Sequence, residues 1–181
     1  MKPPDQPLDA RGLKFAIVAA RFNHDVTERL VEGALECFTA SGTSDVPVEW
    51  VPGSFELPLA ARAIAKTRGV DAVVALGCVI RGGTPHFHFV STETASGLMS
   101  AMLETGIPIS LGVLTTDDLA QAEARAGGDE GNKGWDAAAT ASRWPCSCAG
   151  WKSPPRTLEP SDSIRPCSGW SSPKVHSKRI R

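Results

Sequence analysis

The sequence carries little that would assign the protein to a membrane or a nucleic acid. Its 181 residues include 19 Lys and Arg against 20 Asp and Glu, so the net charge is −1 at pH 7. So small a net charge argues against a dominant nucleic-acid or membrane-binding surface. No apolar run approaches the length of a membrane span, and residues 1–12 lack the apolar segment of a secretion signal. We therefore expect a cytoplasmic protein with no membrane and no nucleic-acid partner.

The sequence also lacks the motifs of disulfide frameworks, metal sites and dinucleotide sites. Five cysteines are an odd number at scattered spacings, which disfavours a disulfide framework. His86 and His88 would point to different faces of a helix, and no carboxylate or cysteine joins them at ligand spacing, so zinc is disfavoured. Neither Gly-x-Gly-x-x-Gly after a strand nor Gly-Lys-Ser/Thr is present. The sequence therefore predicts neither a zinc site nor a dinucleotide site.

Composition divides the chain near residue 141. Residues 1–141 hold 11 basic and 18 acidic residues, whereas residues 142–181 hold 8 basic and 2 acidic ones together with 6 of the 14 prolines. The last segment shows no apolar period of strand or helix, which is typical of disorder. We predict a flexible arm over residues 1–12, one folded domain over 13–141 and a disordered basic tail over 142–181.

The first 141 residues alternate apolar runs with segments of helical period. The apolar runs predict strands at residues 14–20, 46–51, 71–80 and 107–114. Between and after them, capping residues and apolar periodicity predict helices at residues 25–40, 54–68, 86–104 and 115–127, and a last one after residue 134. Nearly continuous apolar strands between helices predict an α/β fold, with a parallel sheet covered on both faces.

The junction after the third predicted strand carries the clearest chemical signal. The apolar run ends in Arg81-Gly82-Gly83-Thr84, and a helical pattern begins at once. Glycines let backbone N–H groups approach a ligand closely, and the first N–H groups of a helix suit a phosphate. His86 lies on the first turn of that helix, so a proton carrier stands beside the predicted anion site. Ligands of parallel sheets bind at the carboxyl ends of the strands, where this junction would lie.

Single residues around this junction have ordinary structural explanations as well. Ser54 is suited to cap a helix, and Glu56 in a first helical turn is favoured by the helix dipole. Phe22 alone is consistent with a core residue or a partly exposed aromatic, and Cys78 with a small apolar strand residue. Arg125 lies near the end of a predicted helix, where a cation is stabilised without any ligand.

Six sequence blocks in order carry a more specific signal. They are residues 21–23 (Arg-Phe-Asn), 50–58, 77–87, 112–116, 123–127 and 131–134 (Gly-Asn-Lys-Gly). Together they resemble the lumazine synthase family, also called the riboflavin synthase beta-chain family, from about residue 13 to residue 141. The resemblance implies a three-layer, flavodoxin-like fold in which helices flank a four-stranded parallel sheet.

The resemblance also implies an activity. Members condense 5-amino-6-(D-ribitylamino)uracil with 3,4-dihydroxy-2-butanone 4-phosphate to give 6,7-dimethyl-8-ribityllumazine, phosphate and water. This is the penultimate step of riboflavin biosynthesis, and it uses no cofactor or metal. The family forms homopentamers or icosahedral shells, with riboflavin synthase as a further partner.

Matching the family motifs to this chain assigns roles to its residues. His86 matches the proton-transfer histidine, and Phe22 the aromatic that stacks on the pyrimidine. The polar edges and ribityl chain of that substrate would be bound by Ser54, Phe55, Glu56, Cys78, Val79 and Ile80. The phosphate would be held by Gly83, Thr84 and Arg125. Because the family builds its site between subunits, Leu111, Arg125 and Lys133 would come from the adjacent chain.

Two departures from the family pattern bear on this expectation. The family commonly has phenylalanine where Leu111 stands, so the pocket keeps an apolar wall but loses a stacking face. The family's last helix continues past residue 141, whereas residues 142–145 (Ser-Arg-Trp-Pro) predict a break here. A reading-frame change in the gene would explain the composition of residues 142–181.

The sequence leaves three other readings open. The first is a non-catalytic flavin- or lumazine-binding protein of the same fold, which would need neither His86 nor Arg125. The second is a synthase that is inactive because its altered C-terminus impairs assembly. The third is a nucleic-acid binder that uses the basic residues of the tail.

Overall fold

The computed structural model describes residues 8–148, with side chains placed through residue 144. Its four main strands are β1 (Phe15–Ala20), β2 (Val48–Val51), β3 (Ala72–Ile80) and β4 (Ile109–Thr116). They form one parallel sheet in the order β2-β1-β3-β4. The predicted α/β class and the four-stranded parallel sheet are therefore confirmed.

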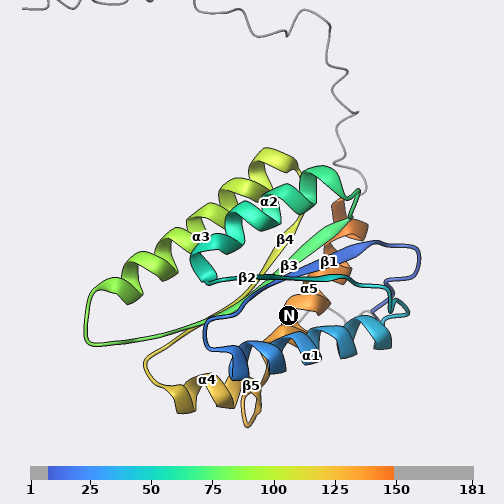
Figure 1. The fold of residues 1–181 in the computed structure, drawn as a ribbon. Coiled ribbons are helices and arrows are strands. Elements are labelled where there is room, and N and C mark those ends of the chain that lie inside the picture. The colour runs from blue at the N-terminus through green and yellow to red at the C-terminus, as the bar shows by residue number, and fades with distance from the viewer. Residues whose placement is uncertain (1–7, 149–181) are drawn as a thin grey trace, which may run out of the picture.

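Helices cover both faces of this sheet (Figure 1). On one face lie α2 (Leu57–Thr67) and α3 (His86–Thr105), and on the other lie α1 (His24–Ala40), α4 (Leu119–Arg125) and α5 (Lys133–Cys148). A 3-10 turn, η1 (Ser54–Glu56), precedes α2. Two short antiparallel strands, β5 (Ala126–Gly128) and β6 (Gly131–Asn132), lead into α5. The result is a three-layer molecule with a core on each face of the sheet.

The central strand β1 shows why apolar runs, rather than alternating patterns, mark these strands. All six of its residues are buried. Ile17 belongs to the core under α1 and α5, whereas its neighbour Val18 belongs to the core under α2 and α3. Because successive side chains point to opposite faces and both faces are covered, each position must be apolar.

The predicted break of the last helix at residues 142–145 is wrong, because α5 continues to Cys148. A proline inside a helix costs roughly 3 kcal/mol, so packing must outweigh this cost. Ala141 and Ser142 are buried, and the Ser142 hydroxyl donates a hydrogen bond to the Ala138 carbonyl. At the other end of the helix, any side chain on Gly134 would collide with the backbone of Leu30 in α1. The close approach of α1 and α5 thus anchors the helix that carries Pro145.

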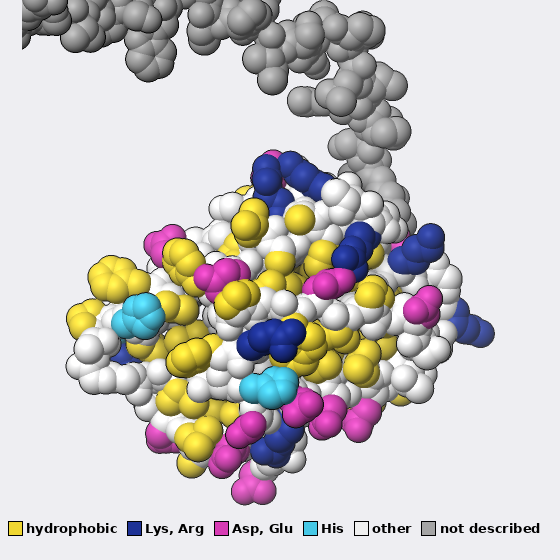
Figure 2. Space-filling model, viewed as in Figure 1, with side chains coloured by type: hydrophobic (Ala, Val, Ile, Leu, Met, Phe, Trp, Pro, Cys, Tyr) yellow, Lys and Arg dark blue, Asp and Glu magenta, His cyan; other side chains and the backbone are white. Residues whose placement is uncertain are grey.

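Large apolar side chains remain exposed on the described part of the chain. They include Leu59, Met99, Leu103, Leu111 and Leu119. Figure 2 shows apolar side chains gathered in patches between charged groups on one face. None of the helices within residues 8–148 has the length and apolar character needed to cross a membrane. Residues 1–7 of the predicted arm, and the predicted tail from residue 149 onwards, lie outside the described residues.

Candidate active site

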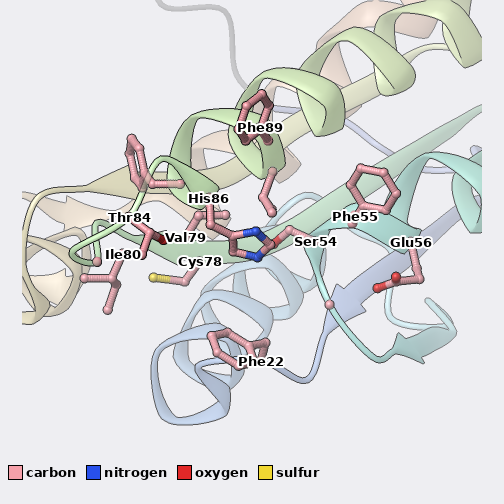
Figure 3. Close-up of a pocket in the computed structure, with 14 residues that line it drawn as sticks. Phe22, Ser54, Phe55, Glu56, Cys78, Val79, Ile80, Thr84, His86 and Phe89 are labelled. Carbon is pink, nitrogen blue, oxygen red and sulfur yellow. The ribbon is translucent and has the colours of Figure 1, made fainter.

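A cavity of about 570 Å³ opens at the carboxyl ends of β1 and β3. Three chain junctions line it: Phe22 after β1, residues 53–56 after β2, and residues from the end of β3 into α3. Parallel strands bring these junctions to one edge of the sheet, as the sequence predicts. The cavity gathers most of the predicted site residues in one place (Figure 3).

Aromatic side chains form the rim of the cavity. Phe22, Phe55 and Phe89 are each at least 60% exposed, although aromatic rings are normally well buried. In Figure 3, Phe22 lies on one side of the His86 ring, and Phe55 and Phe89 lie on the other. Exposed rings around a hollow favour a flat, partly apolar ligand, because binding removes their surface from water.

The inner wall is formed by Cys78, Val79 and Ile80 at the end of β3. Burial raises the pKa of the Cys78 thiol to about 11, so this side chain is neutral at pH 7. A neutral, buried thiol is a poor nucleophile. Cys78 therefore contributes an apolar surface and its backbone to the cavity.

His86 lies at the centre of the cavity view (Figure 3). It is the first residue of α3 and is exposed. Within residues 8–144 its imidazole makes no hydrogen bond or ion pair. Both ring nitrogens are thus available to a ligand, and an imidazole can act as a general acid or base.

The loop from Gly82 to Thr84 is open to solvent beside His86. Gly82 and Thr84 line the cavity, with Gly83 between them. The amides of these three residues make no backbone hydrogen bond within the described chain. Neither glycine has a positive φ, and a Cβ on either would meet no atom within 4 Å. The fold of the chain itself therefore does not require glycine here, whereas a ligand lying against the backbone would.

Ser54 is positioned differently from the sequence-based expectation. It begins the turn η1 and makes no side-chain cap, and α2 starts only at Leu57. Its backbone carbonyl accepts a hydrogen bond from the Thr94 hydroxyl of α3, at 3.0 Å. A Cβ on Gly77 would come within 2.7 Å of the Ser54 Oγ, so this glycine leaves room for the hydroxyl. The predicted helix cap is wrong, but Ser54, Phe55 and Glu56 all line the cavity.

Asn23 fixes the backbone next to Phe22 at the edge of the cavity. Its backbone is left-handed, with φ 57°, a conformation that asparagine tolerates better than most residues. Its side-chain amide donates a hydrogen bond of 2.9 Å to the carbonyl of Cys78. This bond fastens the end of β1 to the end of β3, and so fixes the segment that presents Phe22 to the cavity.

Besides Gly83, three predicted site residues do not line the cavity. Leu111 and Lys133 line a separate groove of about 490 Å³ between α3 and α5. The Lys133 ammonium is 2.8 Å from an Asp136 carboxylate oxygen. The Arg125 guanidinium donates to the Gln121 carbonyl at the end of α4. Within one copy of the chain, these side chains and His86 do not form a single site.

Comparison with known sequences places the chain in a family. Residues 12–145 match the family described as 6,7-dimethyl-8-ribityllumazine synthase. The chain belongs to this family. The 6,7-dimethyl-8-ribityllumazine synthase of Syntrophus aciditrophicus (strain SB) is 53% identical over 136 residues, which cover 74% of this chain and 88% of that protein. The proteins of that name from two strains of Thermus thermophilus are each 56% identical over 136 residues, 74% of this chain and 87% of theirs.

The Gly-Asn-Lys-Gly block that contributes to the family resemblance has a structural role in this chain. The Asn132 side-chain oxygen accepts from the amides of Gly134 and Trp135, at 2.9 and 3.3 Å, and so caps the start of α5. Its amide group donates to the Arg29 carbonyl of α1 at 2.8 Å. A side chain on Gly33 would overlap Asn132. An asparagine before a helix predicts such a cap from the sequence alone. The contact of Asn132 with α1 has no such local signal.

No group of three or more His, Cys, Asp or Glu side chains in the described part of the chain is placed to hold a metal ion. The polar groups that line the cavity are an imidazole, backbone amides, hydroxyls and a carboxylate.

Proposed function

We propose that this protein condenses 5-amino-6-(D-ribitylamino)uracil with 3,4-dihydroxy-2-butanone 4-phosphate in the cavity between Phe22 and the Gly82–Thr84 loop. The products are 6,7-dimethyl-8-ribityllumazine, phosphate and water, and the proposed compartment is the cytoplasm. The observation that carries the proposal is the position of His86, unpartnered within the described residues, between exposed aromatic rings and an open glycine loop. The aromatic rings suit a flat heterocycle, the glycine loop suits a phosphate, and the imidazole between them suits proton transfer.

The pyrimidine is proposed to stack on Phe22, whose ring is 70% exposed. Stacking between aromatic rings contributes about 0.5–1.5 kcal/mol beyond the burial of area. The hydroxyl of Ser54, the carboxylate of Glu56 and the backbone of residues 78–80 would bind the polar edges and the ribityl chain, since all line the same cavity. Phe55 would cover the substrate from the opposite side.

The butanone phosphate is proposed to bind with its phosphate on Gly83 and Thr84. Their amides have no backbone partner in the described fold and stand before the first turn of α3, where the partial positive charge of a helix attracts anions. The ketone would then lie over His86.

The proposed chemistry needs positioning and proton transfer. The pyrimidine amine attacks the ketone, loss of water gives an imine, phosphate leaves, and ring closure with loss of a second water gives the lumazine. Holding two reactants in place is worth effective molarities up to about 10⁵–10⁸ M. A general acid–base group adds roughly 10²–10⁴-fold, and His86 is proposed to be that group because it lines the cavity.

A second copy of the chain is proposed to complete the site. Leu111, Arg125 and Lys133 would approach the cavity from the adjacent subunit of a pentamer or larger shell. In this assembly Arg125 adds a guanidinium to the phosphate, and Leu111 closes the apolar wall. The support is that Leu111 and Lys133 line a groove separate from the cavity, on a molecule that also exposes Met99 and Leu103. Riboflavin synthase is a further proposed partner.

The deciding experiment is an assay of the full-length chain with both substrates, following lumazine by its absorbance. Lumazine that forms faster than in the protein-free mixture supports the proposal. Binding of the pyrimidine by calorimetry without turnover would instead indicate a non-catalytic binding protein. Loss of both binding and assembly would indicate a synthase inactivated by its C-terminus.

A further inference from the structure

Arg81 stands at the centre of a cluster that lies outside the core and borders the cavity, which only Phe87 of the cluster lines. Its Nε donates to an Asp117 carboxylate oxygen at 2.6 Å, and one terminal nitrogen is 3.0 Å from the Nε2 atom of His88. The guanidinium carbon lies 4.2 Å from the centre of the Phe87 ring. One side chain thus contacts an acid, an imidazole and an aromatic face.

These contacts join segments that flank the proposed chemistry. Arg81 follows β3, while Phe87 and His88 are the two residues directly after His86 on α3. Asp117 follows β4, and the Arg81 amide donates to the Thr116 carbonyl at 2.8 Å in the same place. The loops after β3 and β4 run close together at this edge of the sheet (Figure 1). Arg81 therefore ties the first turn of α3 to the end of β4.

The first turn of α3 needs such a tie. The imidazole of His86 has no hydrogen-bond partner within residues 8–144, and the amides of Gly82, Gly83 and Thr84 make no backbone hydrogen bond there. The position of His86 and of the proposed phosphate amides therefore depends on the backbone on either side of them. Arg81 lies before this segment and holds the two residues after His86.

The chemistry of the contact sets the direction of this hydrogen bond. A guanidinium has donors and no acceptor, so the Nε2 atom of His88 accepts in this contact. The Nε atom and one terminal nitrogen of Arg81 are then occupied by protein groups, and its face lies on Phe87. The planar guanidinium makes these three contacts in one fixed arrangement, which the ammonium group of a lysine cannot reproduce.

We propose that Arg81 is a positioning residue for the reaction, acting through Asp117, Phe87 and His88 to hold His86 and the glycine loop in place. This inference rests on the proposed function. A positioning role differs from a direct contact with the phosphate, because a positive charge at residue 81 without the contacts of a guanidinium would not fulfil it.

The test compares Arg81→Met and Arg81→Lys with the matched control Arg62→Met in steady-state assays. Arg62 is a suitable control because it is also about 43% exposed, against 41% for Arg81, and bridges α2 to Glu104 of α3 away from the cavity. Misplacement by about 1 Å can cost on the order of 100-fold in rate. We expect both Arg81 variants to lose roughly 10- to 100-fold in kcat, with a raised KM for the butanone phosphate and little change for the pyrimidine. Arg62→Met should keep wild-type kcat and KM.

A second pair of variants tests the acceptor on α3. His88→Gln keeps an acceptor for Arg81 and should retain most of the activity, whereas His88→Leu removes it and should behave like Arg81→Met. Thermal unfolding of each variant separates loss of activity from loss of fold.

The outcomes separate this inference from the proposed function. A wild-type chain that forms no lumazine removes the proposed function itself. If the wild type is active but Arg81→Lys restores full kcat and KM, Arg81 acts through its charge, and the positioning role is wrong. It is equally wrong if folded Arg81→Met is as active as wild type, or if His88→Leu and His88→Gln do not differ.

Discussion

At the scale of single residues, the site contains side chains of two kinds. Phe22 and His86 both line the cavity. The glycine loop before His86 is a local signal in the sequence, whereas Phe22 alone has ordinary structural explanations and is predicted only through the family resemblance. Asn23, Arg81 and Asn132 act on backbone or side chains far along the chain. Their partners depend on how the elements pack, so the sequence alone could not indicate what each one fastens.

The first prediction concerns His86. His86→Ala should lower kcat for lumazine formation by roughly 10²–10⁴-fold, because a proton carrier is lost. The dissociation constant of the pyrimidine, measured by calorimetry, should stay near the wild-type value, since Phe22 and residues 54–56 are untouched. An unchanged kcat at saturating substrates would remove His86 from the proposed mechanism.

Arg125 gives a second prediction at this scale. In one chain its guanidinium donates to the Gln121 carbonyl, and a guanidinium has five N–H donors, so others remain for a phosphate brought by another copy. Arg125→Ala should raise the KM for the butanone phosphate by about tenfold or more and leave the KM for the pyrimidine nearly unchanged, consistent with a charge-assisted bond of about 1.5–3 kcal/mol. Equal effects on both constants would instead support a purely structural role at the end of α4.

At the scale of elements, the order of strands and helices could be predicted because each has its own apolar period, but several ends could not. The fourth strand is shifted from the predicted residues 107–114 to Ile109–Thr116, because its limits are set by pairing with β3. The helix predicted from residue 54 is divided into η1 and α2. The last helix passes the predicted break because α5 packs closely on α1, which local sequence does not reveal.

An ion-pair cluster between α2 and α3 leads to a prediction about pH. Hydrogen bonds from Arg62 and then Lys66 lower the pKa of Glu104 to about 2 from 4.5. A lowered pKa means that the ionised form stabilises the fold. This contribution is present above about pH 4.5 and is lost as the pH falls towards 2.

Glu104→Gln should therefore lower the Tm slightly at pH 7, since exposed ion pairs stabilise weakly. The difference in Tm between wild type and variant should shrink from about pH 4.5 to about pH 2. Glu93→Gln is the control, because Glu93 is exposed on the same helix and has no ion pair within the described residues. A Tm difference that stays constant over this range would contradict the stabilising role of the ionised carboxylate.

At the scale of the whole molecule, the α/β class could be predicted, but the sheet order β2-β1-β3-β4 is set by tertiary contacts. The separation of two pockets explains why the proposed site is incomplete in one chain. Phe22 and His86 lie in one hollow, whereas Leu111 and Lys133 lie in another between α3 and α5. If a neighbouring copy supplies the second set, each active site belongs to two chains.

Mixing two impaired variants tests whether the site is shared, when activity is measured at a butanone phosphate concentration well below the wild-type KM. His86→Ala and Arg125→Ala place their defects on opposite sides of a shared site, so co-assembly from equal amounts should rebuild about one site in four, in which both sides are intact. We expect a mixture that is dissociated and reassembled to rise to roughly a quarter of wild-type activity, whereas mixing without dissociation should leave only the residual activity of Arg125→Ala. The matched control pairs His86→Ala with Phe22→Ala, whose defects lie in the same cavity of one chain and whose co-assembly should restore nothing. Equal activity in both reassembled mixtures, or no recovery in either from variants that do co-assemble, would show that each chain carries its whole site.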